Sequence, residues 1–206
     1  MRNQPTPNLS LEKPVTASAA DGRALSVHRP DDENLPPVLA RLAVETFVLE
    51  NRIFEGRGFF PSPLLDEAAA CFVCVKTFGR KLRGCIGTVR PTRRTLAEEI
   101  IANAISAATR DPRFPPVSAA ELPLLRFTVD ILDTPEPARL EDLDPAEFGV
   151  IVEDNTGQRR GLLLPALDGV ETACEQVQIA ARKGGISSGE PHQLYRFRVR
   201  RFREAV

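Results

Sequence analysis

Hydrophobic and polar residues alternate along several short stretches of the chain, and this period of two predicts β-strands. The clearest stretch is 125–132, in which Leu125, Phe127, Val129 and Ile131 would face a core. The same pattern predicts strands over 71–77, 82–89, 148–152, 159–164 and 194–202. Short turns containing glycine join 71–77 to 82–89 and 148–152 to 159–164. Each of these two pairs of strands therefore predicts an antiparallel hairpin.

Three other segments space their hydrophobic residues three and four positions apart, which indicates amphipathic helices. They cover 36–53, 95–110 and 170–183. Thr95 followed by Glu98 is typical of a capping box at a helix start. Gly184 and Gly185 predict the end of the third helix. The spacing places Cys174 on the core side of that helix.

Residues 1–34 are rich in Pro, Ser, Ala, Asn and Asp and contain few large hydrophobic side chains. Such a segment buries too little apolar surface to offset its ordering entropy, so we expect a mobile tail. The remaining 35–206 are expected to form the folded domain.

The overall composition excludes several classes of protein. The 206 residues carry a net charge of −1, so no global field attracts nucleic acid. No apolar run approaches the length of about 20 residues that spans a bilayer, and no signal peptide is visible. Four cysteines do not form a disulfide framework in a chain of this length. We therefore expect a cytoplasmic protein that contacts neither nucleic acid nor membrane.

The strand 82–87 contains residues that are unusual inside a strand. Strict alternation would place Leu82, Gly84 and Ile86 on one face and Arg83, Cys85 and Gly87 on the other. Glycine inside a strand often marks a close approach to the backbone. One interpretation is a groove that admits a ligand beside Cys85. The other is that the glycines make room for a crossing helix and that Cys85 is a small buried hydrophobic residue.

No metal or cofactor site emerges from the sequence. Cys71 and Cys74 have Cys-x-x-Cys spacing, but residues three apart in a strand point to opposite faces and cannot share one ion. A phosphate-binding loop, a dinucleotide-binding glycine turn and a Gly-x-Ser-x-Gly elbow are all missing from the sequence. A Cys85–His192 pair would need the two residues in reach of each other and a third group to orient the base.

Several blocks of sequence resemble the AMMECR domain family. The strand Leu82–Gly87 reads LRGCIG and is similar to that family's signature hexapeptide. Similar blocks are DPRF at 111–114, GLLLP at 161–165 and KGGI at 183–186. The helix segment 39–43 is also similar, and the resemblance covers about 35–204. One departure is Gly184, where relatives usually carry Ala.

The resemblance implies an α+β fold in two unequal lobes. The larger lobe would hold both chain ends and an antiparallel sheet flanked by helices. The smaller lobe, including 135–190, would hold a short antiparallel sheet, and a cleft would lie between the lobes. The strand pattern agrees if 71–77, 82–89, 125–132 and 194–202 share one sheet and the hairpin over 148–164 belongs to the smaller lobe.

The resemblance also implies that the residues of 82–87 point into that cleft, although the family has no established biochemical activity. One hypothesis is an enzyme in which Cys85 is a nucleophile or covalent acceptor and Arg83 binds an anion or stabilises the thiolate. The other is a non-catalytic module that binds a protein segment or another macromolecule. The candidate binding residues are Leu82, Gly84, Ile86, Gly87, Asp111, Arg113 and Lys183. Asp111 is expected to pair with or orient Arg83, and Memo-like and radical-SAM proteins are the implied pathway partners.

Overall fold

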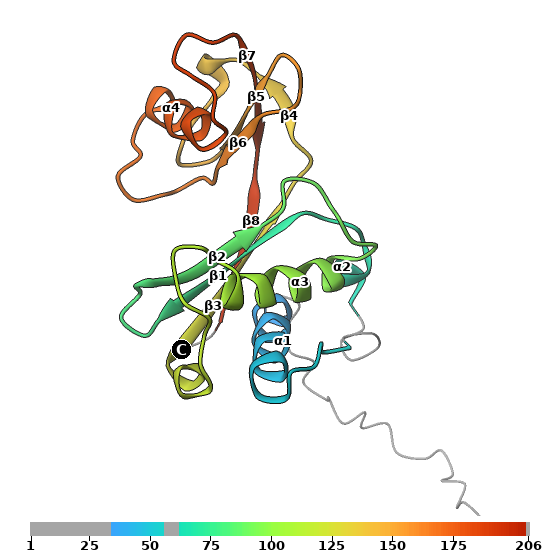
Figure 1. The fold of residues 1–206 in the computed structure, drawn as a ribbon. Coiled ribbons are helices and arrows are strands. Elements are labelled where there is room, and N and C mark those ends of the chain that lie inside the picture. Colours follow the sequence, from blue (N-terminus) through green and yellow to red (C-terminus); the bar gives the residue numbers. More distant parts are fainter. Residues whose placement is uncertain (1–33, 56–61, 205–206) are drawn as a thin grey trace, which may run out of the picture.

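The structure is a computed structural model that describes residues 34–55 and 62–204 (Figure 1). It contains two four-stranded antiparallel sheets with helices packed on them, which confirms the expected α+β class. The expected mobile tail lies outside the described residues except for Asn34. None of the described helices is long and apolar enough to cross a bilayer.

The first sheet has the strand order β2-β1-β3-β8. Its strands are β1 (Cys71–Thr77), β2 (Leu82–Gly87), β3 (Leu125–Leu132) and β8 (Val199–Arg203). Helices α1 (Leu35–Glu50) and α3 (Leu96–Thr109) cover one face, and the short α2 (Pro63–Asp66) packs on α3 (Figure 1). Leu39, Val73, Ile100 and Phe127 are among the fully buried side chains between helices and sheet. The alternation predicted for 125–132 is confirmed, because its four expected core residues are all buried.

The second sheet has the strand order β4-β7-β5-β6. Its strands are β4 (Glu136–Ala138), β5 (Gly149–Asp154), β6 (Arg160–Leu163) and β7 (His192–Phe197). Helix α4 (Ala173–Lys183) packs on β5 and β6. Two short 3-10 helices, η1 (Ala119–Leu124) and η2 (Leu140–Asp142), lie in the connections. The predicted hairpin over 148–164 is confirmed as β5 and β6.

Two stretches of chain run from one sheet into the other. One passes from β3 to β4 and the other from β7 to β8, and the Asp133 N–H donates to the Arg198 carbonyl at 3.0 Å where they meet. The prediction of a single strand over 194–202 in the first sheet was therefore wrong. Arg198 divides this stretch, so that β7 pairs with β5 while β8 pairs with β3. The alternation of hydrophobic and polar residues continues through Arg198. It therefore gives no sign that the chain stops pairing with β5 and begins to pair with β3 at this point.

The helix ends follow local signals. Thr95 accepts a hydrogen bond from the Glu98 N–H at 3.2 Å at the start of α3. Helix α1 ends at Glu50, three residues before its predicted end, because Asn51 adopts a left-handed conformation with φ 51°. Gly184 ends α4 as predicted, and Gly185 follows with φ +68°.

Cys174 is exposed, which corrects the expectation that it packs in the core. Helix α4 turns Gln176 and Ala180 towards the second sheet, and both are fully buried. Cys174 precedes Gln176 by two residues, and each residue of an α-helix rotates the side-chain direction by about 100°. Its side chain therefore points away from the buried face.

Candidate functional site

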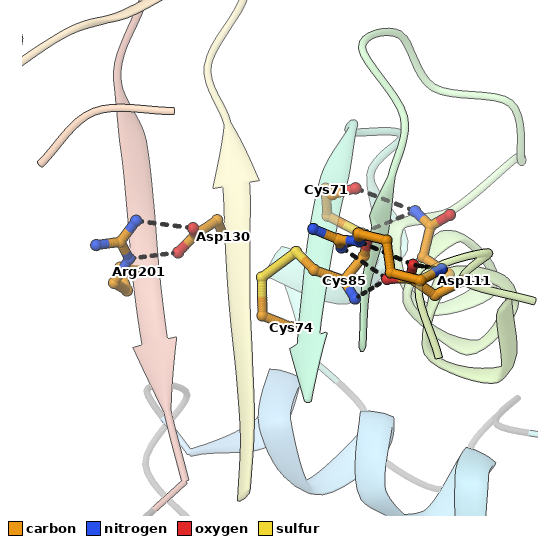
Figure 2. Close-up of a disulfide and its surroundings, with 8 residues drawn as sticks. Cys71, Cys74, Cys85, Asp111, Asp130 and Arg201 are labelled. Atoms are coloured by element: carbon orange, nitrogen blue, oxygen red, sulfur yellow. Dashed lines mark hydrogen bonds and ion pairs between the residues drawn. A yellow bond between two sulfur atoms is a disulfide. The ribbon is translucent and has the colours of Figure 1, made fainter. Parts of the chain in front are cut away.

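Cys85 lies on β2 directly opposite Cys74 on β1, and a disulfide joins their sulfur atoms (Figure 2). Their Cα atoms are 4.1 Å apart. Directly opposed residues without mutual backbone hydrogen bonds have the closest side chains in an antiparallel pair. All four cysteines were expected to be free, and the Cys74–Cys85 disulfide corrects that expectation. The expected opposite orientation of Cys71 is confirmed: Cys71 is buried beside Asn103 of α3.

Asp111 and Arg113 close the open edge of β2. The Cys85 N–H donates to Asp111 Oδ2 at 2.8 Å, and Arg113 Nη2 donates to the Cys85 carbonyl at 3.5 Å. Arg113 Nε also donates to Asp111 Oδ1 at 2.9 Å. Since β2 is an edge strand, these side chains satisfy backbone groups that a further strand would otherwise bind. The loop after α3 therefore holds Cys85 by its main chain.

The Asp111 carboxyl group is 4% exposed and its pKa lies well below the usual range. The hydrogen bond from the Arg113 guanidinium is the main cause. Burial acts in the opposite direction, and the backbone N–H groups of Cys85 and Arg113 lower the pKa further. Asp111 is thus a fixed anion that organises the loop.

Arg83 has no partner residue in the register of β1 and β2, which corrects the strict alternation expected for this strand. The pairing sets Leu82 opposite Lys76 and Gly84 opposite Val75, so Arg83 is an extra residue at a β-bulge. Its Nε donates to Glu121 Oε1 at 2.7 Å. The predicted Asp111–Arg83 interaction was also wrong, because Asp111 binds Arg113 instead.

The Arg83–Glu121 pair links the bulge to η1. The hydrogen bond from Arg83 and those from Ser118 lower the pKa of Glu121 to about 2. The Arg83 guanidinium also lies 5.9 Å from the Phe114 ring centroid. Arg83 Nη1 is buried, and no described residue accepts a hydrogen bond from it.

The two glycines of β2 leave room for the protein itself. A Cβ atom at Gly84 would overlap the Ala107 carbonyl oxygen of α3, and one at Gly87 would overlap the Phe72 ring. The crossing-helix interpretation therefore explains Gly84, and the space beside Gly87 is filled by an aromatic side chain. Ile86 packs against the hydrophobic core between the first sheet and its helices, whereas Leu82 is 38% exposed.

Lys183 brings the second sheet's helix into this region. It is the last residue of α4, and its pKa is lowered by burial and then by the positive charge of Arg113. Blocks that are far apart in the sequence, 111–114 and 183–186, therefore lie near each other. The binding and catalytic roles expected for these residues and for 82–87 stay predictions.

A pocket of about 900 Å³ lies between the two sheets. Val89, Arg90 and Pro91, which follow β2, form part of its wall, and no residue of 82–87 lines it. The lining also includes Arg160, Tyr195 and Arg200, together with Asp133 and Glu153. These residues come from segments that are far apart in the sequence, so no local pattern indicates that they share a pocket.

The charges around this pocket are unevenly paired. Arg160 forms an ion pair with Glu153, and Arg200 Nε lies 4.0 Å from Asp133. Arg90 is exposed, and no described residue forms an ion pair with it. Within the described chain no cluster of His, Cys, Asp and Glu side chains is arranged to hold a metal ion.

Comparisons with known proteins agree on one family. A protein of Thermotoga maritima is 46% identical over 162 residues, which cover 78% of this chain and 92% of that one. A longer protein of Clostridium acetobutylicum is 50% identical over 140 residues, which cover 68% of this chain but only 29% of that one. The crystal structure of an uncharacterized protein of Pyrococcus horikoshii aligns with a TM-score of 0.76 and 30% identity, over 84% of this chain and 91% of that one.

The family profile named AMMECR1 matches residues 38–205, which span both sheets and every helix except the first turn of α1. This match includes β2, the 111–113 loop and the crossing of α3 over β2 at Gly84. The chain belongs to the AMMECR1 family.

Proposed function

We propose that this protein is a binding module that takes up an acidic segment of a partner protein in the pocket between its two sheets. The observation that supports this most directly is the uncompensated charge of Arg90 at a pocket of about 900 Å³. Pockets of this size accommodate several side chains of a ligand. A carboxylate of the partner would supply the anion that Arg90 lacks.

The lining of the pocket favours a peptide segment. Ala70, Val89, Leu132 and Ile151 offer apolar contacts, while the arginines offer charge-assisted hydrogen bonds. Tyr195 adds a large aromatic surface with a polar end. This mixture of apolar and basic groups suits alternating hydrophobic and acidic side chains. The Memo-like and radical-SAM proteins implied by the resemblance are the first partners to search for such a segment.

The β2 strand supports the pocket indirectly in this proposal. The clamp formed by Asp111 and Arg113 fixes β2 at its edge, and Val89–Pro91 continue from β2 into the pocket wall. An enzyme that uses Cys85 as a lone nucleophile has less support, because Cys85 is bonded to Cys74. His192, the candidate base, lies on β7 in the second sheet.

Peptide selection would test the proposal. A phage library of random linear peptides would be panned on the wild-type chain and on Arg90→Glu. We expect the wild type to enrich sequences rich in Asp and Glu, and we expect Arg90→Glu to lose that enrichment because it places a like charge at the pocket.

Arg94→Glu is the matched control, since Arg94 is exposed and close in sequence but does not line the pocket. It should select the same acidic peptides as the wild type. Enrichment of no acidic peptide by the wild type, or equal loss in both variants, would overturn the proposal.

A further inference from the structure

The Cys74–Cys85 disulfide lies on the face of the first sheet that is turned away from α1 and α3. Val73, Val75 and Ile86, their strand neighbours, point into the helix-covered core. Both cysteines are half-buried rather than enclosed. Figure 2 shows the disulfide bridging the two strands, with the Asp130–Arg201 ion pair farther across the sheet. The bond is therefore set in a sheet surface and not in the hydrophobic core.

Strand pairing brings these cysteines together without help from the disulfide. β1 is a central strand, paired with β2 on one side and with β3 on the other. β2 is also held by α3, which crosses Gly84, and by Asp111 and Arg113 at Cys85. Reduction would thus leave two thiols facing each other at the spacing of an ordinary antiparallel pair.

The surroundings of the disulfide carry charges of both signs. The Asp111 carboxylate accepts a hydrogen bond from the Cys85 N–H, and several basic side chains lie on the sheet face that carries Cys74. Across the sheet, Cys85, Cys74, Thr128 and Arg203 stand in one row. In the adjoining row, Lys76 lies opposite Arg126, on the same face as Cys74. Nearby positive charges lower the pKa of a thiol and favour the thiolate that takes part in exchange.

The other two cysteines differ from this pair in ways that serve as internal controls. Cys71 is buried, and burial raises the pKa of its thiol to about 12. Cys174 is exposed and free on α4. Neither is bonded to another cysteine, so the half-buried Cys74–Cys85 pair is the one that can open and close as a disulfide.

We propose that Cys74 and Cys85 form a redox-active couple that exchanges with the dithiol of a partner protein. A partner thiolate attacks one sulfur of the Cys74–Cys85 bond, which breaks while a mixed disulfide forms. The released cysteine leaves as a thiolate and takes a proton. A second partner thiolate then attacks its own sulfur in the mixed disulfide, which frees the other cysteine. Two electrons pass to this chain, and the partner leaves with a disulfide.

The reverse exchange restores the bond, with a partner disulfide as the oxidant. This activity does not depend on the pocket between the sheets, since neither cysteine lines it. Failure to find an acidic peptide that binds in the pocket would therefore leave the proposed disulfide exchange unaffected.

The test uses the full chain with Cys174→Ser, which removes the exposed free thiol. The oxidised protein is equilibrated under native conditions in glutathione buffers of increasing reducing strength. Free thiols are then alkylated and counted by intact mass. We expect two thiols to appear together while the circular dichroism spectrum stays native, and Cys71 to stay unlabelled.

Transfer is measured with a reduced synthetic Cys-Gly-Gly-Cys peptide. We expect one equivalent of peptide disulfide for each oxidised chain, and none with Cys74→Ser/Cys85→Ser, which lacks both sulfurs of the couple. A bond that opens only after denaturation, or an oxidised chain that yields no peptide disulfide, would overturn the proposal. The Cys174→Ser chain retains Cys74 and Cys85. The two measurements made on it therefore do not depend on how well the double variant folds.

Discussion

Asp111 shows how much one carboxylate contributes once the chain has folded around it. Its oxygens accept hydrogen bonds from the Cys85 N–H, the Arg113 N–H and the Arg113 guanidinium. As an exposed loop pair, Asp111 and Arg113 would contribute less than about 1 kcal/mol. Burial of Asp111 makes these contacts harder to replace, because water does not reach the carboxylate freely.

Asp111→Asn should lower the free energy of unfolding by about 1.5 to 3 kcal/mol near neutral pH, because hydrogen bonds to charged groups are lost. The folded state lowers the pKa of Asp111, so its contribution is present above the unfolded value of about 3.9 and is lost as the pH falls below it. The difference in the free energy of unfolding between wild type and variant should therefore become smaller in acid. Urea unfolding at a series of pH values measures this.

Asp168→Asn, at an exposed turn, is the control and should leave the unfolding curve almost unchanged. A gap for Asp111→Asn that stays constant down to strongly acidic pH would show that its charge plays no part.

At the scale of elements, each sheet has a helix that crosses an edge strand at a glycine. In the first sheet α3 crosses β2 at Gly84, where a Cβ would overlap the Ala107 carbonyl. In the second sheet α4 crosses β6 at Gly161, where a Cβ would overlap the Ala180 carbonyl. Two of the blocks on which the family resemblance depends are therefore places where backbones pack closely.

Gly84→Ala should destabilise the protein by about 1 to 3 kcal/mol, because α3 must move away from β2 to admit the methyl group. Thermal unfolding followed by circular dichroism measures the shift in Tm. Gly79→Ala, in the turn of the same hairpin, is the matched control: the nearest atom to its added Cβ is Thr77 Oγ1 at 3.9 Å. Equal Tm values for the two variants would contradict a tight crossing at Gly84.

At the scale of the whole molecule, the two sheets share a packed joint. The buried side chains of Leu132, Ile151, Leu162 and Phe197 form one cluster, and Phe72 of the first sheet packs against it. Two stretches of backbone cross between the sheets beside this cluster (Figure 1). The sheets are thus expected to unfold as one cooperative unit.

Phe197→Ala should cost about 3 to 5 kcal/mol, the range for removing a buried aromatic ring, and should weaken the coupling between the sheets. Urea unfolding followed by amide hydrogen exchange would then show the two sheets losing protection at different urea concentrations. Phe78→Ala is the control, since Phe78 is 57% exposed. Coincident transitions for both sheets in Phe197→Ala would argue against a joint that depends on this ring.

The sequence by itself determined the features that depend on neighbouring residues. Helix starts such as Thr95, the glycine end of α4, both hairpins and the alternation of β3 follow from local spacing, because hydrogen bonds and side-chain direction repeat over a few residues. The α+β class followed from these elements together with the resemblance.

The tertiary structure alone decided what depends on partners distant in the chain. The bulge at Arg83, the pairing of Cys74 with Cys85 and the change of sheet at Arg198 leave the hydrophobic pattern unaltered, so periodicity could not reveal them. The clamp on Cys85 and the pocket between the sheets join residues from separate segments. Their positions are set by strand register and by the way the two sheets pack, and neither quantity is encoded in a short stretch of sequence.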